Sequence, residues 1–179
     1  MKLCKVCKSK FTSMLSTARV CSPICAMRFA RASRDKAEKT AQVKERREDK
    51  VNREKIKSRA DWAKEAQASF NAWVRMRDAH LPCISCGRHH EGQYHAGHYL
   101  SRGARPELAY EPLNCQKQCA PCNVYLSGNI ALYRINLIQR IGLDRVEWLE
   151  GPHEPKKYTI DDLKVIKETY SKLTKEMQE

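Results

Sequence analysis

The 179-residue chain is predicted to be an α+β protein, with a small metal-clamped core, long helices and an N-terminal metal finger. Three observations support this class. Eight of the nine cysteines form two quartets, residues 24–81 contain neither Gly nor Pro, and apolar residues recur at three- and four-residue spacing. We therefore expect a finger at 1–28, a charged helical arm at 29–60, a core with flanking helices at 61–142 and a helical tail at 143–179.

The first segment contains a complete set of candidate zinc ligands: Cys4, Cys7, Cys21 and Cys25. Four cysteines in two close pairs are typical of structural zinc. Phe11 is expected to pack beneath the metal, and Ser22-Pro23 is a typical helix start. Because so small a finger has little core, zinc would supply most of its folding free energy.

Positive charge is concentrated in the N-terminal third. Residues 1–60 hold 18 Lys and Arg against 6 Asp and Glu, a net +12, whereas residues 61–179 hold 16 against 15, a net +1. This asymmetry favours a nucleic-acid partner over a merely soluble charged segment. From Arg31 to Arg59 apolar residues are too few to face a core. The arm could be a solvated helix, a spacer or a phosphate-binding element.

From Asp61 an amphipathic helix is predicted on the spacing of Trp62, Ala66, Phe70 and Trp73, with Pro82 marking its end. Arg75 and Arg77 lie in its last turn. They could contact substrate phosphate, or simply favour the C-terminus of the helix through its dipole.

The C-terminal third is predicted to be helical. One helix is expected over 123–141, interrupted by Gly142, and a short one over 144–150. After a loop, Thr159 and Asp162 form a capping box for a last helix. Its apolar seam either packs internally or pairs with a second copy, and consists of Leu163, Ile166, Tyr170, Leu173 and Met177.

Composition also limits the location of the chain. No apolar run reaches the length of about 18–20 residues that a bilayer requires, and the N-terminus has no signal-peptide core. We therefore expect a cytoplasmic protein with no membrane partner. In a reducing compartment, cysteine pairs favour metal sites over disulfides.

A second quartet frames the central stretch: Cys83, Cys86, Cys119 and Cys122. Four thiolates leave a zinc ion no open coordination position, so any chemistry must use other residues. The candidates are His95, His98, Asn114 and Asn123. His89 and His90 are expected at the surface, and Cys115 is expected to be a small buried residue.

This pattern resembles the ββα-metal core of HNH endonucleases. The resemblance implies that His98 is the general base, that Asn114 holds the histidine-bearing loop, and that His95 and Asn123 bind a catalytic Mg²⁺ or Mn²⁺. Gly97 stands where many such enzymes carry an Asp or His ligand. On a regular strand the two histidines would point to opposite faces, unless a bulge brings them together, and their roles could be exchanged.

Four longer stretches, FNAWVRMRDAHLPCISCGR, HAGHYLSRG, NCQKQCAPCNVYLSGN and YRINLIQRIG, resemble the NinG/Rap family of lambdoid-phage recombination proteins. The resemblance implies a structure-specific endonuclease in the bacterial host cell. It would act on branched DNA such as Holliday junctions and D-loops, beside other phage recombination proteins. The cations expected to contact DNA are Arg75, Arg77, Arg102, Arg105 and Lys117. The alternative is a non-catalytic, zinc-dependent DNA-binding accessory protein.

Overall fold

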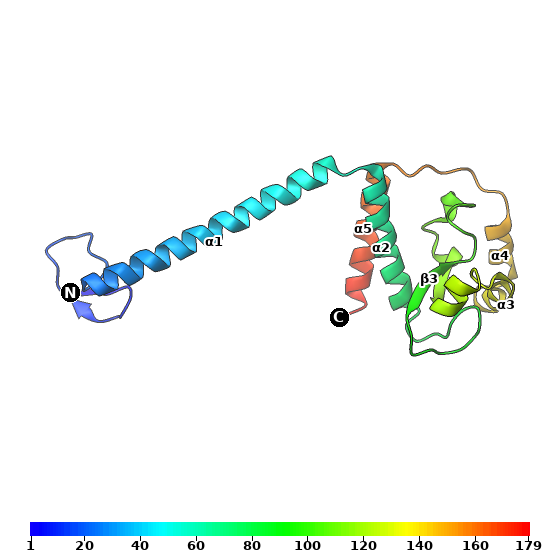
Figure 1. The fold of residues 1–179 in the computed structure, drawn as a ribbon, viewed down its shortest axis with the longest axis horizontal. Coiled ribbons are helices and arrows are strands. Elements are labelled where there is room, and N and C mark those ends of the chain that lie inside the picture. The colour runs from blue at the N-terminus through cyan, green and yellow to red at the C-terminus, as the bar shows by residue number, and fades with distance from the viewer. The chain divides into compact units, whose positions relative to one another are not determined.

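The computed structural model describes all 179 residues and divides them into two compact units, Met1–Ile56 and Lys57–Glu179. The long stretch without Gly or Pro forms two helices, α1 (Pro23–Ile56) and α2 (Arg59–Arg77). The division between the units falls between these helices, at residue 56 (Figure 1).

The first unit is a small hairpin followed by α1. Strand β1 (Lys2–Leu3) pairs antiparallel with β2 (Lys10–Phe11). Helix α1 starts at Pro23, where the backbone N–H of Cys25 donates to Ser22 Oγ at 3.3 Å, as the Ser-Pro pair predicts. Cys25 is the one buried residue of α1, and every side chain from residue 30 to 53 is exposed. The charged arm is therefore a solvated helix.

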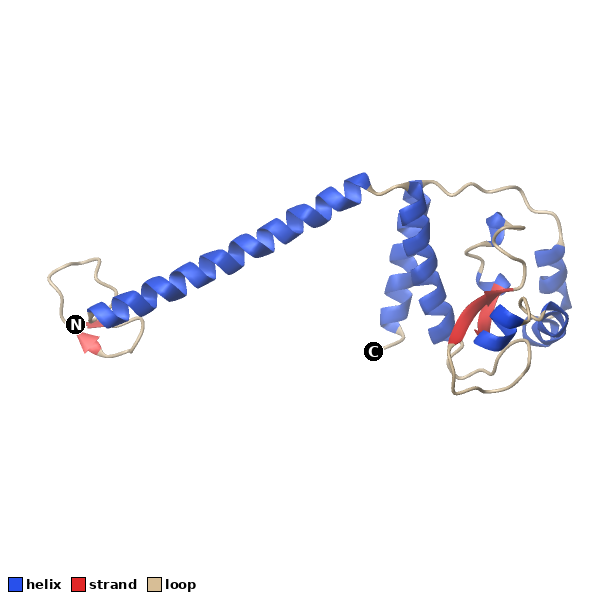
Figure 2. Ribbon diagram, in the orientation of Figure 1, coloured by secondary structure: helices blue, strands red, loops and turns tan.

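The second unit is built around a two-stranded antiparallel hairpin, β3 (Tyr94–His98) and β4 (Cys115–Cys119). Helices α2 and α5 (Ile160–Glu176) lie side by side next to it, and α3 (Ile130–Ile141) and α4 (Leu143–Glu150) lie on its other side (Figures 1 and 2). This is a mixed α+β arrangement, as predicted. No helix in either unit is both long and apolar enough to cross a membrane.

Capping residues fix the starts of the two packed helices. Ser58 caps α2 in a reciprocal capping box with Asp61, three residues before the predicted start. Thr159 and Asp162 form the predicted box at the start of α5. Helix α2 ends at Arg77, five residues before Pro82.

The C-terminal helix is part of the second unit rather than a separate tail beginning at residue 143. The rings of Phe70 and Tyr170 meet edge to face at 4.8 Å, and Trp73 lies 4.9 Å from Tyr170. Leu163 is buried against Trp62 in the same interface. Most of the α5 seam is thus used internally, and pairing with a second copy stays a prediction.

The single helix predicted over 123–141 is wrong. The structure has a short π-helical turn, Pro121–Tyr125, and then a break before α3. Ser127, Gly128 and Asn129 all have positive φ, at 47°, 89° and 46°. This left-handed run turns the chain, so that Leu126 and Ile130 are exposed while Tyr133 and Leu137 enter the core.

Candidate active site and metal centres

Both cysteine quartets converge. The four sulfur atoms of each lie within 4.8 Å of one another. The separations include 3.4 Å for Cys7 and Cys21, and 3.9 Å for Cys86 and Cys119. Zn–S bonds of about 2.3 Å in a tetrahedron give S···S distances of about 3.8 Å. Each quartet could therefore hold one zinc ion, as the sequence predicts.

Polar groups surround the sulfurs of the core quartet. The backbone N–H of Cys119 donates to Cys83 Sγ at 3.3 Å, and His90 Nε2 lies 3.2 Å from Cys86 Sγ. His90 is half-buried, so its predicted place at the surface is wrong, whereas His89 is exposed. The Cys119 N–H stabilises a thiolate, the form of cysteine that binds metal, and His90 would do the same in the tautomer that protonates Nε2.

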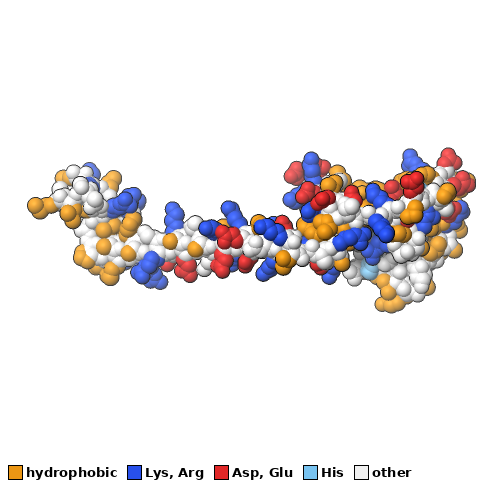
Figure 3. All heavy atoms as spheres, turned by 90° about the horizontal axis from the view of Figure 1, so that it is seen from above, with side chains coloured by type: hydrophobic (Ala, Val, Ile, Leu, Met, Phe, Trp, Pro, Cys, Tyr) orange, Lys and Arg blue, Asp and Glu red, His pale blue; other side chains and the backbone are white.

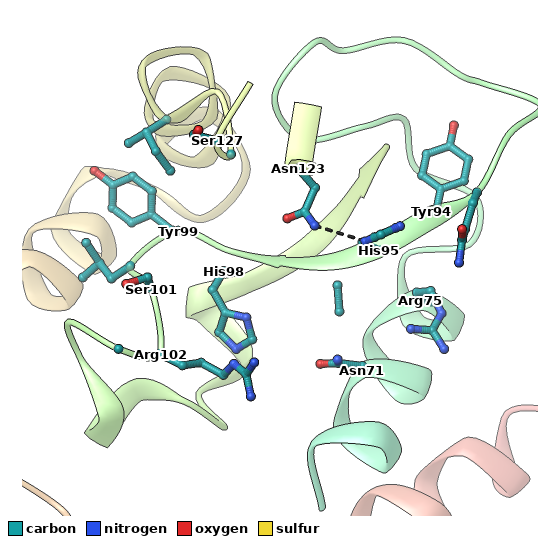
Figure 4. Close-up of a pocket in the computed structure, with 16 residues that line it drawn as sticks. Asn71, Arg75, Tyr94, His95, His98, Tyr99, Ser101, Arg102, Asn123 and Ser127 are labelled. Carbon is teal, nitrogen blue, oxygen red and sulfur yellow. Dashed lines mark hydrogen bonds between the residues drawn. The ribbon is translucent and has the colours of Figure 1, made fainter. Parts of the chain in front are cut away.

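A cavity of about 930 Å³ follows one edge of β3, where that strand has no partner. Figure 4 shows His98 beside Arg102, His95 beside Asn123, and Asn71 and Arg75 on α2 facing them. No carboxylate lines this cavity. Two exposed guanidinium groups and no acid make it suited to an anionic ligand.

The two histidines reach this cavity from opposite faces of a regular strand. Five consecutive residue pairs connect β3 and β4, from Tyr94 with Cys119 to His98 with Cys115, so no bulge separates them. The side chains of residues 95 and 98 alternate to opposite faces of the sheet. Both line the cavity because it lies along the open edge of the strand.

His98 is arranged to keep one nitrogen unprotonated. Its Nε2 lies 3.0 Å from the carbonyl oxygen of Ala109, and since a carbonyl only accepts, Nε2 carries the hydrogen. Burial lowers the pKa of His98 below its usual value, and Arg102 lowers it further, although the hydrogen bond to Ala109 raises it. The other nitrogen, Nδ1, lies 3.8 Å from Cys115 Sγ, which is buried as predicted. An imidazole that is unprotonated at Nδ1 can accept a proton there.

His95 has a different environment. Its Nδ1 lies 3.1 Å from the side-chain amide of Asn123, in the π-helical turn, while its Nε2 is buried and has no hydrogen-bond partner. Asparagine oxygen and nitrogen are interchangeable by a flip of the amide, and Nδ1–H donating to Oδ1 would leave the Nε2 lone pair free. A buried lone pair without a partner, on a ring held by an amide, fits a metal ligand.

Asn114 makes the amide hydrogen bonds predicted for it. It is fully buried, its Oδ1 accepts from the Leu100 N–H at 2.8 Å, and its Nδ2 donates to the carbonyls of Leu100 and Leu108 at 3.0 and 3.1 Å. These bonds close the loop between β3 and β4. The loop carries Arg102 and the Ala109 carbonyl. Asn114 therefore holds in place both of the groups that influence the protonation of His98.

Close packing against Gln118 explains why a glycine, Gly97, precedes His98. A Cβ atom at Gly97 would lie 2.1 Å from Gln118 Oε1 and 2.9 Å from Gln118 Cβ. The Gly97 carbonyl also accepts from the buried Tyr133 hydroxyl at 2.8 Å. An Asp or His ligand at this position has no space, so a metal site here must use other residues.

Three of the five cations predicted to contact DNA instead bond to groups within the protein. Arg77 donates to Asp78 and to the carbonyls of Pro112 and Cys115. Lys117 is buried, with its Nζ donating to the Ala79 carbonyl at 2.7 Å. Arg105 is paired with Glu107 and donates to the Gly151 carbonyl at 2.7 Å. Only Arg75 and Arg102 of the five line the cavity.

The sequence reasoning missed two amides on α2. Gln67 Nε2 donates to Asn71 Oδ1 at 2.7 Å, and Gln67 Oε1 accepts from Arg102 Nη1 at 3.2 Å. These two hydrogen bonds hold Arg102 against α2. A glutamine buried directly after Ala66, on the apolar face of the helix, is the signal that could have identified it.

Comparison with known proteins gives one family. The family model described as "Bacteriophage Lambda NinG protein" matches residues 1–179. Protein ninG of Enterobacteria phage H19B is 39% identical over 186 residues, which covers 98% of this chain and 92% of the relative.

Two further relatives agree. Protein ninG of Salmonella phage P22 is 38% identical over 184 residues, covering 97% of this chain and 91% of the relative. For the protein of the same name from Escherichia phage lambda, identity is 38% over 183 residues, with 96% and 90% coverage. Among solved structures, none matches the chain. With a family model matched from first residue to last, the chain belongs to the NinG family of bacteriophage proteins.

Proposed function

We propose that this protein is a divalent-metal-dependent endonuclease that cleaves branched DNA, including Holliday junctions and D-loops. The observation that carries the proposal is the pairing of His98, whose Nδ1 is unprotonated and whose pKa is lowered, with a cavity lined by Arg75 and Arg102. A proton acceptor beside two guanidinium groups suits attack by water on a phosphodiester. The preference for branched DNA rests on the resemblance to NinG/Rap proteins alone.

In this mechanism, His98 Nδ1 removes a proton from the attacking water. Nε2–H stays bonded to the Ala109 carbonyl, which holds the ring in place through the step. Arg75 and Arg102 bind the non-bridging oxygens of the scissile phosphate and stabilise the charge that develops there. Gln67 keeps the Arg102 guanidinium in position.

His95 Nε2, with Asn123 against the other ring nitrogen, would hold the divalent cation. Such a cation polarises the phosphate and stabilises the leaving 3′ oxygen. With so few protein ligands, most coordination positions would be left for water and phosphate, as is usual for Mg²⁺ at phosphate sites. The two cysteine quartets, by contrast, are closed and would be structural.

A second candidate is a catalytically silent DNA-binding protein on the same scaffold. It is favoured by the lack of any carboxylate in the cavity, since hard divalent cations prefer carboxylate ligands. Simple binding, however, gives no reason for a buried imidazole nitrogen without a partner at His95. We therefore rank the nuclease first.

The deciding experiment is cleavage of a labelled four-way junction beside a linear duplex, with and without Mg²⁺ or Mn²⁺. We expect metal-dependent cleavage of the junction. His98→Ala should lower the rate by about 10²–10⁴-fold, the usual contribution of a general base. Zinc content and junction affinity should stay near wild type, because the imidazole contacts neither quartet.

His89→Ala is the matched control, since His89 is exposed and lies outside the cavity. It should cleave at the wild-type rate. His95→Ala should also cleave slowly, and raising Mn²⁺ should restore part of its activity. Wild-type cleavage by His98→Ala would refute the assignment of the base. No cleavage of any DNA by the wild type under either metal would favour the silent binder.

A further inference from the structure

A second cavity, of about 750 Å³, lies on the other side of Arg102. It is bounded by the first half of α2 and by the segment that leads into α5. Five cations line it and no carboxylate does: Arg59, Lys64, Arg102, Lys156 and Lys157. All five side chains are exposed, so their charges are available to a ligand.

This concentration of charge is not a property of the unit as a whole. Residues 57–179 hold 18 Lys and Arg against 15 Asp and Glu, a net +3. Figure 3 shows basic side chains gathered on one face of this unit, beside a histidine. A nearly neutral unit that directs five cations and no acid into one cavity has a focused positive potential there.

The second cavity adjoins the first. Asn71 and Arg102 line both of them. A ligand that binds the Arg102 guanidinium in the candidate active site therefore has a positively charged path onward along α2. The direction of that path is toward the N-terminal end of α2 and the Lys156-Lys157 pair.

The lysine-bearing segment is held in place. Arg59 Nε donates to the Tyr158 carbonyl at 2.7 Å, and the Tyr158 hydroxyl donates to the Glu107 carbonyl at 2.8 Å. Lys156 Nζ lies 4.9 Å from the centre of the Tyr158 ring. The segment that carries Lys156 and Lys157 is therefore fixed to α2 and to the loop of Arg102 at Tyr158, which limits the ordering that a ligand would have to impose on it.

We propose that the second cavity binds the sugar-phosphate backbone of the DNA strand flanking the phosphate held in the first cavity. The inference rests on the proposed function for its orientation, since Arg102 is shared between the two cavities. Phosphate is the ligand that fits a concave surface with several cations and no acid. Contacts to phosphate carry no sequence information, so binding through these cations would be independent of sequence.

The test measures binding in the cleavage-deficient His98→Ala protein, with a labelled four-way junction over a series of salt concentrations. The variant is Lys156→Gln combined with Lys157→Gln. On duplex DNA the slope of log affinity against log salt changes by about 0.9 for each phosphate contact. We expect the slope to become shallower by about 2 and affinity at low salt to fall, with the melting temperature unchanged.

The matched control is Arg145→Gln combined with Lys175→Gln, which removes the same charge from exposed positions outside both cavities. The control should keep the slope of the parent. A lysine variant that behaves like the control would overturn the inference.

The two proposals can fail separately. If the parent chain with His98 cleaves no DNA but the lysine pair still changes the salt slope, the nuclease fails and the binding cavity stands. If cleavage is normal and the slope is unaffected by the lysine pair, the nuclease stands and the flanking strand lies elsewhere.

Discussion

The protonation of His98 is set by two neighbours and by burial, each with a separate effect. The Ala109 carbonyl determines which nitrogen carries the hydrogen, burial disfavours the imidazolium, and Arg102 adds repulsion by a like charge. Asn114 fixes the loop that carries two of these groups. These surroundings together lower the pKa of His98 and favour its neutral form.

This environment gives a prediction for the pH dependence of cleavage. The base works only when neutral, and its pKa is lowered from the usual 6.5. The rate should therefore be level above neutral pH and fall only as the pH drops below about 6.5. Arg102→Gln should move this acidic limb to higher pH, because a charge that opposes protonation is removed.

Arg75→Gln is the control for that shift. Arg75 lines the same cavity but is not among the groups that perturb the pKa of His98. It should lower the rate by weakening phosphate binding and leave the acidic limb in place. An acidic limb that stays fixed in Arg102→Gln would show that Arg102 does not contribute to the lowered pKa of His98.

At the scale of elements, α2 forms a wall for the cavity on one side and packs against α5 on the other. Its buried residues include Trp62, Phe70 and Val74, and the ring of Phe70 lies 6.2 Å from that of His98. Phe70 also contacts Tyr170 of α5. The position of α5 thus supports the wall that carries Arg75 and Asn71.

This arrangement predicts different effects for two neighbouring residues of α5. Leu163 is 1% exposed and Val165 is 62% exposed. Leu163→Ala should lower the free energy of unfolding by about 2–5 kcal/mol, and Val165→Ala should change it by less than about 0.5 kcal/mol. Denaturant unfolding of each variant beside the wild type measures both changes in free energy. If Leu163→Ala were no more destabilising than Val165→Ala, the internal packing of α5 would be contradicted.

The sequence predicts these elements where local rules agree. Apolar spacing identified α2 and α5, and Thr159 with Asp162 identified the start of α5. The same spacing misled at 126–130, because Leu126 and Ile130 continue the pattern across a Ser-Gly-Asn turn. There the turn residues overrode the periodicity.

The site was predicted in part, for a similar reason. Cysteine spacing identifies both quartets, since close pairs are local in sequence. The fate of a cation is not local: Arg77 and Arg75 are two residues apart, yet one is bonded to backbone carbonyls 35 and 38 residues away and the other lines the cavity. Only the tertiary structure separates them.

At the scale of the whole molecule, the two units each have their own cysteine quartet. Metal analysis should give two zinc ions per chain. Cys4→Ser should lose one zinc and the fold of residues 1–56, while residues 57–179 keep a cooperative melt. Cys83→Ser should unfold the second unit, because three of the four cysteines of its quartet are buried and Cys119 belongs to β4. A count near one zinc in the wild type would remove one of these sites.

The division into units also predicts where DNA affinity resides. Residues 1–56 hold 16 Lys and Arg against 6 Asp and Glu, a net +10, and the side chains of α1 are exposed from residue 30 to 53. A chain starting at Lys57 keeps the Ser58–Asp61 capping box, so α2 and its unit should stay folded.

If α1 contacts phosphate, this truncated chain should bind DNA more weakly, with a slope of log affinity against log salt that is shallower by about 0.9 for each lost contact. The surroundings of His98 all belong to residues 57–179 and would be unchanged, so cleavage at saturating protein should continue. An unchanged slope would show that α1 is a spacer, and that the cations of the second unit supply the affinity for DNA.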